Sequence, residues 1–166
     1  MPQQLLKNIK RIVVHATSTL ADQDAGYEFC YRVHVKENKW AAVGYHYGIE
    51  QDGNIWQGRA IDFGKGKADI GAHVRGFNTG SIAIVLSGGC SAIFENEDGH
   101  TEYEFADTFS EIQKLNLAEL IKGIIKKCEA AGATDIEVVG HNDLDPNKPC
   151  PCFDVKAWWE EVLAAA

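Results

Sequence analysis

Residues 140–154 read GHNDLDPNKPCPCFD and combine a histidine, a lysine and two cysteines with three prolines. Proline fixes φ and has no backbone N–H, so this segment is predicted to be a loop. The apolar run 136–139 before it is typical of a short strand, which places His141 where that strand ends. Metal-binding and charged side chains gathered in a loop at a strand end indicate a functional site.

A second histidine stands in the same position relative to a strand near the N-terminus. Residues 11–14 form a strand-like run that ends in His15, and a polar segment follows. If the two strands are neighbours in one sheet, His15 and His141 meet at the same edge. Cys150 then completes a His-His-Cys set, a kind that holds catalytic zinc and leaves a fourth position open to water.

The length of 166 residues fits one domain over residues 1–166, and a domain of this size can bury a core without disulfides. The net charge of −8 and the pI of about 5.2 argue against nucleic acid or an anionic membrane surface as the main partner, because both attract clustered lysine and arginine. No apolar run is long enough for a bilayer span or a signal peptide. We therefore expect the protein to accumulate in the cytoplasm of the producing or host cell. We also expect it to be a monomer.

The five cysteines form an odd set with irregular spacing, which fits a reducing compartment better than a disulfide framework. Cys128 lies at helical spacing from apolar residues and is predicted to be a small core residue. Cys30, in an expected helix, and Cys90, after an expected strand, have the same interpretation. Only Cys150 and Cys152 stand in a loop.

Several apolar runs predict the strands of one sheet. Residues 81–86 are largely apolar, which is typical of a strand buried on both faces. Asp52-Gly53 marks a hairpin turn between the strand-like runs 43–49 and 55–57. With helices placed between the strands, we expect an α/β fold with a single mixed central β-sheet flanked by helices.

Helices are expected over residues 20–39, 112–128 and 155–163. The broad apolar stripe of 112–128 is the clearest of the three, with Thr108 or Ser110 as its cap. Thr17-Ser18-Thr19 is predicted to cap the first helix, and Asp154 the last.

The remaining segments are glycine-rich or acidic. Residues 58–80 are predicted to form an extended loop, and loops of this length in compact domains are often functional. His73 within it either lines a cleft or is exposed to solvent. The acidic stretch 91–107 is expected to be a surface excursion. The other histidines are predicted to be structural: His34 a surface or flank residue, His100 a surface residue, and His46 a core or support residue.

The order of these features along the chain is more specific to one protein family than any single feature is. The set comprises His15 after Val-Val, VGYHY (43–47), DGNIWQGR (52–59), GAH (71–73), NTGSIAI (78–84), and His141 with CPCFD (150–154). Together they resemble the zinc-dependent N-acetylmuramoyl-L-alanine amidases of the type 2 family. That family includes phage endolysins of the lysozyme type and the animal peptidoglycan recognition proteins. The resemblance covers nearly the whole chain.

The resemblance implies one Zn²⁺ per chain, held by His15, His141 and Cys150. It also implies catalytic roles for Tyr45 and Lys148, substrate contacts from His73 and Asn78, and cleavage of the amide between N-acetylmuramic acid and L-alanine in peptidoglycan. The loop from His141 to Cys150 is one residue longer than is common in the family, and Cys152 offers a second sulfur. Cys150 is the predicted ligand because it precedes Pro151 in the family's Cys-Pro-x-Phe-Asp pattern.

The predicted chemistry gives Lys148 and Tyr45 separate tasks. The Lys148 ammonium would neutralise the carbonyl oxygen as it becomes an oxyanion, and the Tyr45 hydroxyl would hydrogen-bond the attacking water or the intermediate. Strand alternation predicts that Tyr45 and Tyr47 share one face while Gly44 and His46 share the other.

The predicted function is that of a phage-type endolysin that reaches the cell wall after release. Three other interpretations of the function stay open. One is a cytosolic amidase that recycles muropeptides, although such relatives typically carry aspartate in place of Cys150. Another is a peptidoglycan-binding module without catalysis, although such proteins lack part of the metal set. The third is a regulatory partner of another protein, and the sequence contains nothing for or against this role.

Overall fold

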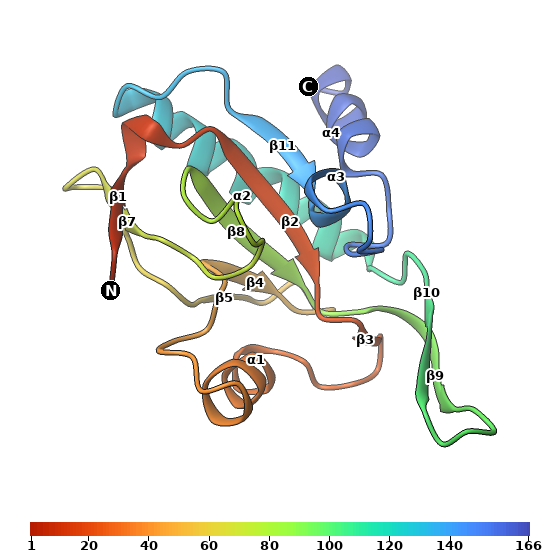
Figure 1. Cartoon of the computed structure of the whole chain (residues 1–166). Helices are drawn as coiled ribbons and strands as arrows, with labels where there is room; N and C mark the ends of the chain where they lie inside the picture. The colour runs from red at the N-terminus through yellow and green to blue at the C-terminus, as the bar shows by residue number, and fades with distance from the viewer.

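A five-stranded sheet crosses the middle of the protein in the order β11-β2-β8-β4-β5. The computed structural model describes residues 1–166, and in it these strands are Glu137–Gly140, Arg11–Ala16, Ser81–Leu86, Tyr47–Ile49 and Ile55–Gln57, in that order. The first four are parallel to one another, and β5 pairs antiparallel with β4 through the predicted hairpin. The predicted α/β fold with a mixed central sheet is confirmed (Figure 1).

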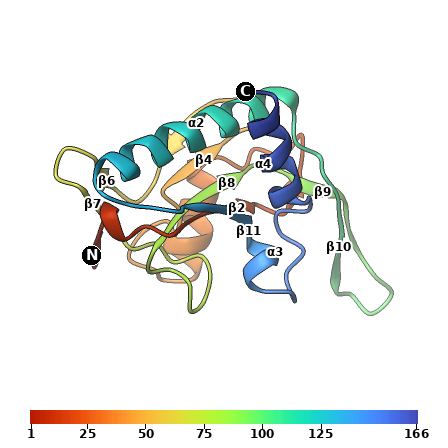
Figure 2. The ribbon, with the colours of Figure 1, turned by 90° about the horizontal axis from the view of Figure 1, so that it is seen from above.

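The long helix α2 (Glu111–Ala130) covers one face of this sheet, as Figure 2 shows. Its apolar stripe packs on Ile12, Ile82 and Ile84 in a core cluster of 17 buried residues. Ser110, one of the two predicted caps, begins the helix: its hydroxyl accepts the N–H of Gln113, and the Gln113 side chain accepts the N–H of Ser110. Cys128 is fully buried in this core, as predicted.

The other face carries a shorter helix than predicted. α1 spans only Tyr27–Tyr31 and continues as a π-helical turn over Arg32–Glu37, so the helix expected over residues 20–39 begins late. Thr17-Ser18-Thr19 does not cap it, and Gly26 holds that position. The reason is tertiary, because Thr19–Leu20 forms strand β3 and pairs with Gly89 and Cys90.

Two small sheets flank the central one, and neither was predicted. In the first, β7 (Lys67–Asp69) lies between β1 (Gln3–Leu5) and β6 (Ile61–Asp62), so the stretch 58–80 is not wholly loop. In the second, β9 (Gly89–Glu95) lies between β3 and β10 (Thr101–Phe105). The acidic stretch 91–107 is thus a surface excursion as expected, but an ordered hairpin that projects from the body (Figures 1 and 2).

The segment after β11 is more regular than its prolines suggested. His141–Leu144 forms one helical turn, α3, before Pro146, and the Asp143 carboxylate accepts the N–H of Gly140 at its start. The final helix α4 (Val155–Ala164) is capped as predicted, because the Asp154 carboxylate accepts the N–H of Ala157. A short 3₁₀ turn, Leu6–Asn8, completes the elements. None of the helices combines the length and the apolar character that a bilayer crossing requires.

The contact between β4 and β5 gives a stability test. Gly48 lies under the indole of Trp56, and a Cβ at this position would overlap the ring. We expect Gly48→Ala to lower the free energy of unfolding by about 1–3 kcal/mol through overpacking, measured by urea denaturation. Gly123→Ala is the control, because nothing lies within 4 Å of a Cβ there. In the exposed middle of α2 it should raise stability by about 0.5–1 kcal/mol. Equal effects of the two changes would contradict this packing.

Candidate active site

The ends of two parallel strands bring the predicted histidines together. β11 pairs with β2 so that Gly140 lies opposite Val14, and the next residues along the two strands are His141 and His15. Their ring centroids are 4.8 Å apart. The prediction that both histidines reach one edge of the sheet is confirmed.

Cys150 joins the two histidines to form a donor set suited to a metal ion. A nitrogen of each ring and the Cys150 Sγ all lie within 4.8 Å of one another. Zinc binds imidazole nitrogen at about 2.0–2.1 Å and thiolate sulfur at about 2.3 Å, so one ion fits between donors at this spacing. The Ala16 N–H at the end of β2 donates to the Cys150 Sγ at 3.0 Å. Cys152 lies outside this cluster, near Gly89.

The electrostatics of the cluster favour neutral histidines. Burial, followed by the neighbouring histidines, lowers the pKa of His15 well below its usual value. Burial also lowers the pKa of His141. Both rings are therefore neutral near pH 7 and keep the lone pair that a metal needs. Burial raises the pKa of the Cys150 thiol to about 12, and a bound cation would reverse that preference by stabilising the thiolate.

His73 lies in the cleft and supports His15. Its Nδ1 is 2.8 Å from the Nε2 of His15, which leaves Nδ1 of His15 as the nitrogen free to face a metal. A hydrogen bond of this kind fixes the ring orientation and tautomer of a metal ligand. Burial lowers the pKa of His73 to about 3, so this histidine is neutral as well.

Asn78 shapes the loop that carries His73. Its side-chain oxygen accepts the backbone N–H groups of His73 and Val74, at 2.8 and 2.9 Å. A contact between Asn78 and substrate stays a prediction.

Tyr45 lies beside the donor set, but strand alternation did not place it correctly. Its ring centroid is 5.1 Å from that of His15. Tyr47 packs in the core on the α2 side, while Tyr45 packs with Val43 and Val85 on the other side, so the two tyrosines do not share a face. The cause is that β4 begins only at Tyr47, and alternation does not extend to the irregular residues before it. Burial raises the pKa of Tyr45, so its hydroxyl remains a hydrogen-bond donor.

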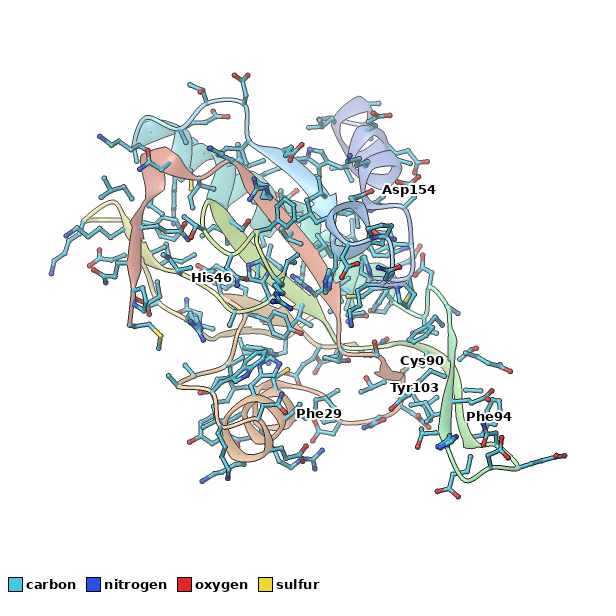
Figure 3. The ribbon with its side chains drawn as sticks, in the orientation of Figure 1. Phe29, His46, Cys90, Phe94, Tyr103 and Asp154 are labelled. Carbon is cyan, nitrogen blue, oxygen red and sulfur yellow. The ribbon has the colours of Figure 1, made fainter.

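Two further histidines, His34 and His46, are buried beside the site, and the position of His34 differs from the prediction. His34 is buried, not at the surface: its ring lies 4.5 Å from that of Trp40 and 5.2 Å from that of Tyr45, and its Nδ1 accepts the Gly44 N–H. No local pattern marks these contacts, because they follow from the π-helical turn. His46 is a buried support as predicted (Figure 3); its Nδ1 accepts the Ala83 N–H, and its Nε2 donates to the Asp69 carbonyl.

A cleft of about 540 Å³ opens over the donor set and is also lined by Tyr45, His73 and Lys148. Lys148 is exposed. Its charge adds to the burial that lowers the pKa of His141, and it partly offsets the burial that raises the pKa of Cys150. Phe29, Tyr103 and Phe105 line the cleft as well. No sequence pattern had marked these three aromatic residues as part of a site.

Comparison with known proteins assigns the family. Residues 5–153 match the sequence profile of the N-acetylmuramoyl-L-alanine amidases. The chain belongs to this family. Among curated proteins, the amidase is 34% identical to an endolysin of Klebsiella phage KP32 over 151 residues, which are 91% of this chain and 85% of the relative. It is 31% identical to an endolysin of Escherichia phage T7 over 150 residues, 90% of this chain and 85% of that one.

Solved structures agree with this assignment. An endolysin N-acetylmuramoyl-L-alanine amidase from Clostridium intestinale superposes with a TM-score of 0.67 at 25% identity, covering 99% of this chain and 88% of that one. Bumblebee PGRP-SA shares the fold, with a TM-score of 0.68 at 22% identity over 94% of this chain and 83% of that one.

The cluster geometry distinguishes the two loop cysteines. We expect Cys150→Ser to weaken zinc affinity by more than about a hundredfold, because it removes one of three donors. Cys152→Ser, the matched control, should change it less than about threefold, because Cys152 lies outside the donor set. Competition with a chromogenic chelator measures both affinities. Loss of metal from the Cys152 variant alone would show that the longer loop has shifted the register.

Proposed function

We propose that this amidase is a zinc-dependent endolysin that hydrolyses the amide between N-acetylmuramic acid and L-alanine in peptidoglycan. The observation that carries the proposal is the His15, His141 and Cys150 donor set at the floor of the cleft, in a chain of this family. When bound there, zinc supplies a Lewis acid that polarises an amide carbonyl and lowers the pKa of water to about 7.

The chain's own residues supply the rest of the chemistry. Tyr45, protonated beside His15, can donate a hydrogen bond to an oxygen held over the donors. Lys148, on the loop that ends in Cys150, places a positive charge at the same cleft, where negative charge develops as the carbonyl carbon becomes tetrahedral. His73 holds His15 in one orientation and tautomer through the 2.8 Å hydrogen bond.

The alternatives fit the site less well. A peptidoglycan-binding module without catalysis has no use for a complete donor set flanked by Tyr45 and Lys148. A muropeptide-recycling amidase of the cytosol typically has aspartate where Cys150 stands. We therefore place the activity at the cell wall, which the protein reaches from the cytoplasm once the membrane is breached, and we expect it to act as a monomer.

The reaction itself is the first test. Intact sacculi incubated with the purified protein should release stem peptides with a new N-terminal L-alanine, identified by mass spectrometry. Dialysis against a chelator should abolish the release, and an equimolar amount of zinc should restore it. Release of new reducing sugar ends in place of N-terminal alanine, or full activity without metal, would refute the proposal.

Tyr45 and Lys148 should affect turnover and not metal binding. Each is expected to stabilise charge that appears only in the transition state, and loss of one such donor lowers kcat by about a hundred- to a thousandfold. Tyr45→Phe and Lys148→Ala should therefore keep about one zinc per chain and a nearly unchanged KM while losing most turnover. Steady-state kinetics with metal analysis of the same samples checks this. If a variant cleaves at the parent rate, the residue that it replaces has no catalytic role.

A further inference from the structure

The β9–β10 hairpin separates its aromatic residues by face. Tyr103 and Phe105 are two residues apart on β10 and point to one side, where their rings stack 12° from parallel with centroids 5.9 Å apart. Phe94 lies opposite Glu102 in the ladder, so it points to the other side with the glutamate. All three are substantially exposed, at 47%, 43% and 44%. Folding therefore gains little from these rings.

Only one of the two faces belongs to the active-site cleft. Tyr103 and Phe105 line the same cleft as the donor set, together with Phe29 of α1, and Phe94 does not. Figure 3 shows Tyr103 on the side of the hairpin toward Phe29, with Phe94 farther out. The exposed aromatic surface is thus continuous with the place where the amide is cut.

The base of the hairpin is fixed to the site. Gly89 and Cys90 pair with Thr19 and Leu20 of β3, which follows directly on the strand that carries His15. The Ala106 N–H donates to the Gly89 carbonyl at 3.0 Å, which closes the base. The two aromatic rings therefore hold a defined position relative to the donors.

We propose that Tyr103 and Phe105 form an aromatic wall that binds the sugar rings of the glycan strand adjacent to the muramic acid whose amide is cleaved. This inference rests on the proposed amidase function. A pyranose ring presents an apolar face of C–H bonds, and aromatic rings with exposed faces or a polar edge are suited to pack against it while the hydroxyls stay in water. The two stacked rings line the cleft itself, so they are placed to contact what the cleft binds.

The charges favour the glycan over the stem peptide. The hairpin carries five acidic residues and no lysine or arginine: Glu95, Glu97, Asp98, Glu102 and Glu104. Glu102 and Glu104 alternate with the two rings and point away from the cleft, so the hairpin acts through its net negative charge and not through direct contacts. That charge disfavours the free carboxylates of a stem peptide, whereas the N-acetylated sugars are neutral. Lys148, on a different wall of the cleft, is the one lysine there and offers the peptide a cation. The substrate would lie with its sugar chain along β10 and its peptide toward the 147–150 loop.

Glycan length is the variable that tests the wall. We would compare the parent with the double variant Tyr103→Ala and Phe105→Ala on two soluble substrates that share one stem peptide. One substrate carries a single muramic acid, and the other carries that muramic acid within several disaccharides. The double variant should raise KM about tenfold for the longer glycan, change it less than twofold for the single sugar, and leave kcat nearly unchanged. Phe94→Ala, equally exposed on the opposite face, should behave as the parent.

Binding to peptide-free glycan strands, measured by calorimetry, separates this inference from the amidase proposal. The parent should bind them, and the double variant should bind about tenfold more weakly. A parent that binds the strands but cleaves no muropeptide would refute the amidase function and support the wall. No binding by the parent, an equal loss with Phe94→Ala, or a KM change that follows peptide length would overturn the wall.

Discussion

The parallel pairing of β2 with β11 is the constraint on which the active site depends. It sets His15 and His141 side by side at one edge of the sheet, although they lie far apart in the sequence. The same strand end holds the third donor, because the backbone N–H of Ala16 donates to the Cys150 Sγ. Both strands are pinned by apolar burial, since Ile12, Val13 and Val139 are almost completely enclosed. A slip of one residue would turn these side chains to the wrong face, so the core fixes the register and the register fixes the site.

Buried histidines surround this edge, and each is held neutral by its surroundings. An unpaired buried polar group costs about 1–3 kcal/mol, so such rings need partners. His46 bonds a backbone group at each nitrogen, joining β8 to the segment before His73. His34 accepts from Gly44, and His73 meets His15 through its Nδ1, while the buried Nε2 of His73 has no protein partner. These bonds set the orientation of each ring, which leaves the donors arranged for a cation before one arrives and reduces the ordering that binding requires.

The parts of the fold that could be predicted are those with strong local patterns. The apolar runs gave β2, β8 and β11, and the wide stripe behind Ser110 gave α2. The prediction failed where distant contacts override local preference. Thr19 looked like a helix cap but pairs with Gly89 across 70 residues, and His34 looked exposed but is enclosed by Trp40 and Tyr45. The donor set was predictable because it depends on strand ends, whereas the cleft walls depend on a hairpin whose alternation was hidden by its acidic composition.

The base of that hairpin shows how the wall and the metal donors are tied together. Gly88 and Gly89 have φ values of +130° and +103°, a region that side chains disfavour. A Cβ at Gly89 would lie 3.0 Å from the Cβ of Ala16 and 3.4 Å from the Sγ of Cys152. Glycine therefore lets the hairpin approach both the strand end that supports Cys150 and the loop that follows it. Cys152 lies against the hairpin base, whereas Cys150 is one of the three donors, so one short loop contacts both the hairpin that carries the aromatic wall and the donor set.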